Sequence, residues 1–281
     1  MKKIISVVLS FALILTCFAF SASAEEATDY LVLGDSIAYG SGLSNPVDAV
    51  YGKIVADTHG FNYINYSVPG HTTSNLLNRL KNEDVIDAVK NAEIISISIG
   101  GNNFLMSNLT GLIFDSVVKS DYTKMDEIAE GFYNEFCLVM DVINENNPDA
   151  IVLMQTLYNP QSGKLREVYA EGQKRLNEMI AKYDAEHPGE IIIVDVGTAL
   201  GEDMECFAAD DIHPSAKGNL LIAAEVLKTL NDNNIAEYKE PVITAEGQDF
   251  TMGFSFAFLD IIVTLFEFLG KIYRFFTGIF G

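Results

Sequence analysis

Short apolar runs rich in β-branched residues recur along the chain after its N-terminal segment. Four of them stand out, at residues 30–33, 94–99, 150–155 and 191–194, and a weaker fifth lies at residues 61–68. Because these runs are apolar throughout rather than alternating with polar residues, they indicate strands that are buried on both faces. The pattern predicts a five-stranded parallel sheet covered by helices.

The segments between these runs have helical periodicity. Before Pro148, apolar residues recur at intervals of three and four, which predicts one long amphipathic helix. Its predicted buried face consists of Met125, Ile128, Ala129, Phe132, Phe136, Val139, Met140 and Ile143. Residues 165–183 and 216–230 show the same spacing. Alternating strands and helices predict a three-layer α/β domain with one core, from about residue 27 to residue 234.

The N-terminus has the composition of a secretory signal peptide. Lys2 and Lys3 precede an apolar run at residues 4–20, and Ala22-Ser23-Ala24 provides the small residues of a cleavage site. We therefore expect residues 1–24 to be removed and the mature chain to be secreted or extracytoplasmic. An uncleaved membrane anchor is the alternative interpretation.

Charge and cysteine content exclude several classes of function. The chain has 39 Asp and Glu residues against 18 Lys and Arg, a formal net charge of −21, and this becomes −23 when Lys2 and Lys3 leave with the signal peptide. Nucleic-acid binding needs clustered cations, so it is not expected. No Cys-x-x-Cys pair or His/Cys cluster has the spacing of a zinc site, so no metal is implied. Whether Cys137 and Cys206 form a disulfide stays open.

A serine and a histidine follow two of the predicted strands. Ser36 lies directly after the first strand, and Asp210-Asp211-Ile212-His213 follows the last one. Carboxyl ends of parallel strands meet at one edge of the sheet, where ligands bind. A serine becomes a nucleophile when a base lies within reach and a third group orients that base. Three-residue spacing favours Asp210 over Asp211 as the group that orients His213.

Hydrogen-bond donors for an oxyanion follow two further strands. Gly70 can present its backbone N–H closely because it has no side chain, and Asn102 offers a side-chain amide after Gly100-Gly101. Together with the N–H of Ser36, these groups predict an oxyanion hole made by Ser36, Gly70 and Asn102.

These motifs, in this order, resemble the SGNH or GDSL family of esterases and lipases. The resemblance covers most of the mature chain and implies a flavodoxin-like sheet, with Ser36, Asp210 and His213 as the catalytic residues. It implies no cofactor. Two positions depart from the family pattern: Ile37 replaces the usual Leu after the serine, and Asn103 replaces an Asp that braces the oxyanion loop.

Three further residues are candidates for contact with substrate. His71 directly follows Gly70, Tyr39 follows the serine motif, and Asn103 follows Asn102. Each also has a structural interpretation, because aromatic residues and turns beside a site serve packing as often as binding.

The C-terminal part of the chain changes character twice. Residues 236–249 read as a polar linker, and residues 250–281 are strongly apolar with a narrow polar stripe, which predicts an amphipathic hydrophobic helix. Three roles compete for this helix. It lies on a membrane surface, it docks on the catalytic domain or self-associates, or it spans the bilayer, where its acidic residues would be costly.

The sequence thus predicts a secreted serine ester hydrolase, lipase- or lysophospholipase-like, that cleaves acyl esters of lipids. A carbohydrate O-deacetylase of the same family is one alternative, with an acylated carbohydrate as its substrate. A non-catalytic, membrane-associated binding protein with the same fold is the other.

Overall fold

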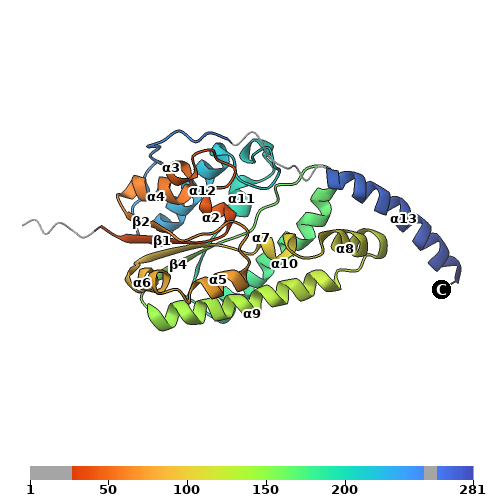
Figure 1. The fold of residues 1–281 in the computed structure, drawn as a ribbon, viewed down its shortest axis with the longest axis horizontal. Helices are drawn as coiled ribbons and strands as arrows, with labels where there is room; N and C mark the ends of the chain where they lie inside the picture. The colour runs from red at the N-terminus through yellow and green to blue at the C-terminus, as the bar shows by residue number, and fades with distance from the viewer. Residues whose placement is uncertain (1–26, 250–257, 281) are drawn as a thin grey trace, which may run out of the picture.

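Five parallel strands form one sheet in the computed structural model, which describes residues 27–249 and 258–280 (Figure 1). The strands are β1 (Asp29–Gly34), β2 (Asn62–Asn65), β3 (Ile94–Ser98), β4 (Ile151–Gln155) and β5 (Ile192–Val194). Their spatial order is β2-β1-β3-β4-β5, and every neighbouring pair is parallel. This is the flavodoxin-like order, so the predicted fold class is confirmed.

The edge strand β2 is shorter than the apolar run that predicted it. Beyond Asn65 the backbone N–H groups of Tyr66 and Val68 still donate to Val32 and Gly34 of β1. The N–H of Ser67 instead donates to the side chain of Asn65, which ends the regular strand. The chain therefore follows β1 up to the carboxyl edge of the sheet, where Gly70 lies.

Helices cover both faces of the sheet. Eight of those in the described residues are short: α2 (Ser36–Tyr39), α3 (Pro46–Ala49), α5 (Thr73–Arg79), α7 (Gly101–Leu105), α8 (Leu109–Phe114), the π-helical turn η1 (Asp115–Lys119), α11 (Val196–Leu200) and the 3₁₀ turn η2 (Met204–Cys206). The others are α4 (Tyr51–His59), α6 (Glu83–Asn91), α9 (Thr123–Asn146), α10 (Leu165–Glu186), α12 (Ala216–Asp232) and α13 (Leu259–Phe280). Figure 1 shows α4 and α12 on one face of the sheet and α5, α6 and α9 on the other.

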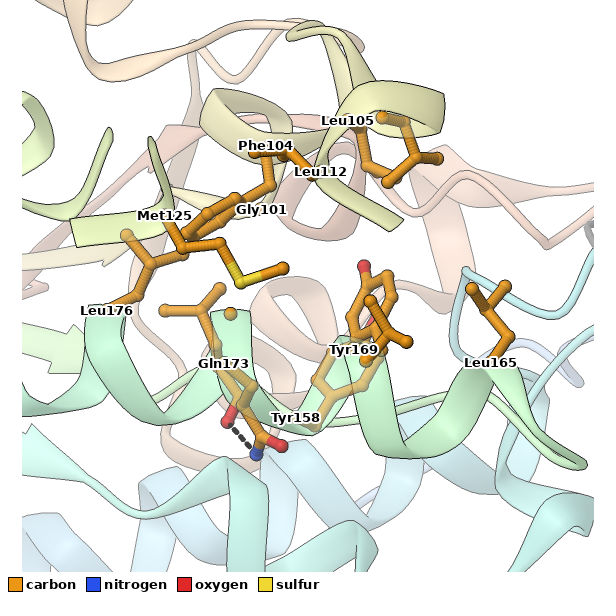
Figure 2. A pocket seen from close by; sticks show the side chains of 14 residues that line it. Gly101, Phe104, Leu105, Leu112, Met125, Tyr158, Leu165, Tyr169, Gln173 and Leu176 are labelled. Carbon is orange, nitrogen blue, oxygen red and sulfur yellow. Dashed lines mark hydrogen bonds between the residues drawn. The ribbon is translucent and has the colours of Figure 1, made fainter. Parts of the chain in front are cut away.

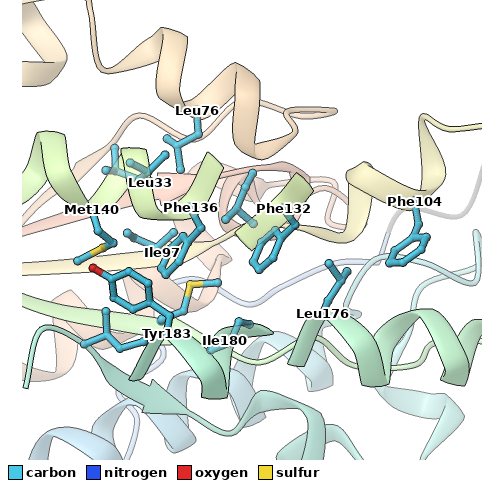
Figure 3. Packing of buried hydrophobic residues seen from close by; sticks show 14 of the residues in the cluster. Leu33, Leu76, Ile97, Phe104, Phe132, Phe136, Met140, Leu176, Ile180 and Tyr183 are labelled. Carbon is cyan, nitrogen blue, oxygen red and sulfur yellow. The ribbon is translucent and has the colours of Figure 1, made fainter. Parts of the chain in front are cut away.

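The larger of the two cores lies between the sheet and the helices α9 and α10. Phe132 and Phe136 of α9 stack with ring centroids 5.8 Å apart, and Phe136 meets Tyr183 of α10 edge to face at 5.0 Å (Figure 3). The predicted face of α9 is buried, except that Ile128 at its margin is half-buried. Cys137 of α9 and Cys206 of η2 are free thiols, which answers the open question of their pairing.

The segment expected to be a linker is hydrogen-bonded to the domain. Within residues 236–249, the N–H of Val242 donates to Thr58 at 2.9 Å, and the carbonyl of Gln248 accepts from the N–H of Ser44 at 2.7 Å. The carboxylate of Asp249 accepts from the N–H of Ala216, the first residue of α12. The chain thus crosses the domain from α12 toward α13 along a defined path.

The C-terminal helix α13 packs on the catalytic domain with one side of its N-terminal half. Leu259 and Val263 are buried, and Phe266 meets Phe114 of α8 edge to face with ring centroids 5.2 Å apart. Its other contacts are with η1 and α10. Among the helices of residues 27–249 and 258–280, none is both long enough and apolar enough to cross a bilayer. One side of α13 is thus docked on the domain, as one of the three alternatives predicted.

Truncation of Phe132 tests this core. The side chain is fully buried between α9 and the sheet, so Phe132→Ala removes apolar contacts and leaves a cavity, which costs about 3–5 kcal/mol. Leu138→Ala on the same helix is the control, because Leu138 is 50% exposed and its loss changes stability by less than about 1 kcal/mol. Urea unfolding followed by circular dichroism measures both. Equal losses for the two variants would contradict the described packing of α9.

Candidate active site

The serine lies where the ends of β1 and β3 come closest. Gly34 has φ +142°, and a Cβ there would overlap the carbonyl oxygen of Ser98 at the end of β3. Only glycine permits this approach. The N–H of Asp35 donates to the same Ser98 carbonyl at 3.1 Å, and the Asp35 carboxylate accepts from the N–H of Ile37 at 3.0 Å. These bonds fix the turn, so Ser36 begins α2 at the topological switch point of the sheet, where ligands bind in such folds.

The predicted oxyanion donors come from the ends of β2 and β3. Asn102 is 6% exposed, and its Nδ2 donates one hydrogen to the His71 carbonyl at 3.0 Å, which leaves its second hydrogen available. Gly70 has φ +81°, a conformation that favours glycine, and its N–H has no partner among the described residues. Ser36 is the first residue of a helix, so its N–H has no intrahelical acceptor. Three donors are therefore present at this edge of the sheet.

The structure brings Asp210 and His213 together in one turn. The ring Nδ1 of His213 lies 2.5 Å from Asp210 Oδ2, while Asp210 Oδ1 accepts from the N–H groups of Ile212 and His213 at 3.0 Å. Burial works to raise the pKa of Asp210, but the hydrogen bonds from His213 outweigh it and hold the pKa below its usual value. The carboxylate thus stays ionised and leaves Nε2 of His213 as the nitrogen available for proton transfer.

Residues after β4 brace the loop that carries the histidine. Tyr158 donates its hydroxyl to the Ile212 carbonyl at 2.8 Å, and Gln161 Nε2 donates to the Asp211 carbonyl at 2.5 Å. Asp211 has φ +57°, so this turn is strained for a residue with a side chain and depends on such bonds. Sequence reasoning missed Tyr158 and Gln161. Their position directly after a buried strand was the available signal, the same one that identified Ser36.

The cavity at Ser36 reaches the residue that precedes His213. Ser36 and Ile212 both line it, and a Cβ on Gly42 would lie 2.8 Å from Cβ of His213, so the histidine packs against the loop that follows α2. Within the described residues, no direct hydrogen bond joins Ser36 to His213. Such contacts are often long in enzymes without substrate and shorten in the complex. The arrangement can pass a proton from a serine hydroxyl to an oriented imidazole.

None of the three substrate-contact candidates lines this cavity. Tyr39 is 42% exposed, and His71 is half-buried. Asn103 donates to Thr73 Oγ1 at 2.7 Å, and Thr73 donates to Glu135 of α9 at 2.5 Å. Asn103 therefore braces the oxyanion loop through a neighbouring carboxylate, which shows how the loop is held without the usual Asp.

An apolar pocket adjoins the serine cavity. It is lined by the α7–α8 segment on one side and by α10 on the other. Figure 2 shows Phe104 and Leu112 approaching from the first side and Leu165 and Tyr169 from the second. The residues that line both the pocket and the cavity at Ser36 are Gly101, Leu105, Leu157, Tyr158 and Tyr169.

The carboxyl of Asp35 is buried beneath the serine. Burial raises its pKa to about 7, although the hydrogen bond from Ile37 and the nearby His213 both act to lower it. Within the described residues, no group of three or more His, Cys, Asp or Glu side chains is arranged to hold a metal ion.

Replacement of Asp35 by Asn tests this buried carboxyl. The carboxyl of an unfolded Asp has a pKa of about 3.9. Between about pH 4 and 7 the folded protein therefore holds a proton that the unfolded chain has lost. The contribution of Asp35 to stability therefore falls as pH rises through this window. Urea unfolding from pH 4 to 8 should show the wild type losing stability relative to Asp35→Asn up to about pH 7, with a constant difference above it. A difference that is the same at every pH would contradict this assignment.

Comparison with known proteins bears on the family and on the fold. The model of the GDSL-like lipase/acylhydrolase family matches residues 32–221. The uncharacterized protein YpmR of Bacillus subtilis (strain 168) is 24% identical over an alignment of 257 residues that covers 83% of this chain and 98% of YpmR.

Solved structures share the fold. The lipase Lip_vut3 from a goat rumen metagenome superposes with a TM-score of 0.62 at 20% identity, over 72% of this chain and 97% of the lipase. An extracellular lipase from Streptomyces rimosus gives a TM-score of 0.56 at 19% identity, over 73% of this chain and 99% of that one. Because the family match covers most of the chain, including the serine cavity, this protein belongs to the GDSL-like lipase/acylhydrolase family and is a carboxylic ester hydrolase.

Proposed function

We propose that this ester hydrolase cleaves esters of long-chain fatty acids, with Ser36 as nucleophile, His213 as general base and Asp210 as the group that orients the histidine. One observation carries the choice of substrate. The cavity at Ser36 adjoins an apolar pocket and shares lining residues with it, Leu157 and Tyr169 among them, so an acyl chain bound in the pocket would have its carbonyl carbon beside the serine.

Acylation begins with proton transfer. His213 takes the proton of the Ser36 hydroxyl on Nε2 while Oγ forms a bond to the ester carbonyl carbon. Asp210, bonded to Nδ1, stabilises the imidazolium that results. The negative charge on the former carbonyl oxygen is met by the N–H groups of Ser36 and Gly70 and by the free amide hydrogen of Asn102. Fixed donors of this kind act mainly on the transition state.

Acylation ends when His213 gives its proton to the departing alcohol oxygen as the bond between the carbonyl carbon and that oxygen breaks, which leaves an acyl group on Ser36. Deacylation then repeats these steps with water. His213 then removes a proton from water, whose oxygen attacks the acyl carbon. Collapse of the second intermediate returns the proton to Ser36 and releases the fatty acid.

The pocket supplies the preference for chain length. Each methylene that leaves water for an apolar site contributes about 0.8 kcal/mol. If that energy is expressed in the transition state, kcat/KM rises roughly threefold to fourfold for each added methylene until the pocket is full. Acetyl esters would leave the pocket empty and gain none of it.

The location of the enzyme follows from two features of the sequence. We propose that residues 1–24, which lie outside the described residues, are a cleaved signal peptide and that the mature enzyme acts outside the cytoplasm. A strongly acidic chain is soluble there and does not bind anionic polymers.

Helix α13 supports action at a lipid surface. Opposite its docked side it exposes a row of large apolar residues, called here the α13 stripe, which consists of Ile261, Leu265, Phe268, Ile272, Phe275 and Phe276. Three of its members are aromatic, and an apolar helix face of this kind binds in the interface plane of a bilayer. Because the proposed substrate is a water-insoluble ester, we assign the stripe to a lipid surface rather than to a second copy. The net charge of −23 on the mature chain, which is the −21 of the full chain without Lys2 and Lys3, favours zwitterionic over anionic lipid.

Hydrolysis of p-nitrophenyl esters tests the proposed function. The mature chain should turn over esters from acetyl to hexadecanoyl with kcat/KM rising along the series to a maximum at long chains. Ser36→Ala and His213→Ala should each lose at least about 10⁴-fold in kcat, because the catalytic residues act as a unit.

Other outcomes assign a different function. A maximum at acetyl would indicate the carbohydrate O-deacetylase, and hydrolysis of acetylated xylan would then be measured. Turnover that Ser36→Ala does not abolish, or no turnover of any ester by the wild type, would refute the proposed mechanism and favour the non-catalytic binding protein.

Substitution in the α13 stripe tests the lipid contact. The double variant Phe268→Ser/Phe275→Ser removes two side chains that are 61% and 63% exposed, and each contributes about 1.5–3 kcal/mol when buried in an apolar phase. We expect at least a tenfold weaker partition onto phosphatidylcholine vesicles, measured by co-sedimentation. Leu138→Ser, on an exposed position of α9, is the control and should partition like the wild type. Wild-type protein that stays in solution as a dimer would show that the stripe binds a second copy instead.

A further inference from the structure

The helix that forms one side of the apolar pocket has no N-terminal cap of its own. At the start of α10, Lys164 occupies the N-cap position and makes no capping hydrogen bond with its side chain. The first N–H of the helix, that of Leu165, donates instead to Asp260 Oδ1 at 2.8 Å. Asp260 belongs to the first turn of α13, 95 residues further along the chain. A carboxylate from the C-terminal helix thus caps the pocket helix.

The backbone before α10 is shaped to admit this carboxylate. Gly163 has φ +63°, and a Cβ on it would overlap Asp260 Oδ2. Glycine therefore meets two requirements at once, a left-handed backbone and the absence of a side chain where Asp260 approaches. Lys164 also forms an ion pair with Glu267 of α13, but both side chains are more than 40% exposed, so this pair adds little.

The capped end of α10 is part of the pocket. The pocket is lined by three residues from the first turns of the helix, Leu165, Val168 and Tyr169. Leu165 is also the residue whose N–H donates to Asp260. Leu259 and Val263 of α13 belong to the same apolar core as Leu165. The negative charge of Asp260 also lies at the positive end of the α10 dipole, where it is favourable. Any displacement of this turn changes the width of the pocket.

We infer that Asp260 is a positioning residue that fixes the α10 side of the pocket and thereby sets the affinity for long acyl chains. This inference rests on the proposed function, because it takes the pocket as the site of the acyl chain. Asp260 lies beyond residues 32–221, which match the family, so the C-terminal extension takes part in substrate selection. The serine cavity itself makes no contact with Asp260, since Asp260 does not line it.

Kinetics of Asp260→Ala on two esters test the inference. Loss of a helix cap corresponds to about a fivefold change in an equilibrium constant. We expect KM for the dodecanoyl ester to rise about fivefold while its kcat, and both constants for the acetyl ester, stay within twofold of the wild type. Gly163→Ala, which displaces the carboxylate, should show the same pattern. Asp260→Asn keeps an acceptor that caps helices well and should restore KM to within twofold.

Two comparisons separate positioning from a general loss of structure. Thr277→Ala is the control on α13, since the Thr277 hydroxyl donates to the carbonyls of Tyr273 and Arg274 in its own helix, and its kinetics should equal those of the wild type. Equal losses on acetyl and dodecanoyl esters, no change in Asp260→Ala, or an Asp260→Asn protein as weak as Asp260→Ala would each overturn the inference.

Binding of dodecanoate distinguishes this inference from the proposed function. Calorimetry on Ser36→Ala and on Ser36→Ala/Asp260→Ala measures affinity without hydrolysis, and we expect the second protein to bind about fivefold more weakly. If the wild type does not hydrolyse long-chain esters but this difference is seen, the proposed function fails and the role of Asp260 stands. Equal affinities, or no binding of dodecanoate by either protein, would overturn the role of Asp260.

Discussion

The close approach of β1 and β3 at their carboxyl ends is the constraint on which the site depends. These two strands flank the switch point of the sheet, where the chain leaves in opposite directions and opens a crevice. A side chain on Gly34 would force the strand ends apart at Ser98. With glycine there, the Ser98 carbonyl accepts from Asp35, and Ser36 and Asn102 line the same cavity. The serine is thus placed by backbone packing of the sheet rather than by contacts of its own side chain.

The loop after β4 connects the loop that carries His213 with the apolar pocket. Tyr158 donates to the backbone of Ile212 beside His213, and its ring lines both the pocket and the serine cavity. The polar hydroxyl of Tyr158 holds the histidine loop, and its apolar ring forms part of the pocket wall. Occupation of the pocket and orientation of the histidine loop are therefore physically linked through one side chain.

The chain beyond the family domain is integrated with the domain through two helix caps. Asp249 accepts from the first N–H of α12, which follows His213, and Asp260 accepts from the first N–H of α10, which lines the pocket. Each carboxylate satisfies a donor that a helix leaves unpaired and lies at the positive end of its dipole. The C-terminal extension thus stabilises elements on both sides of the site, while the outer side of α13 stays free for the α13 stripe.

The sequence by itself determined the sheet, the long helices and the residues at the strand ends. Apolar runs and helical spacing depend on local order along the chain, and Asp210 and His213 are close enough in sequence to meet in one turn. The sequence did not predict the pocket, because Leu157 and Tyr169 are residue types that are equally common in a core. Only the packing of the folded chain leaves a space between them. The cap on α10 was equally hidden, since it joins Asp260 to a backbone group 95 residues away. Tertiary structure decided these features because they depend on which distant segments come into contact, and no local pattern encodes that.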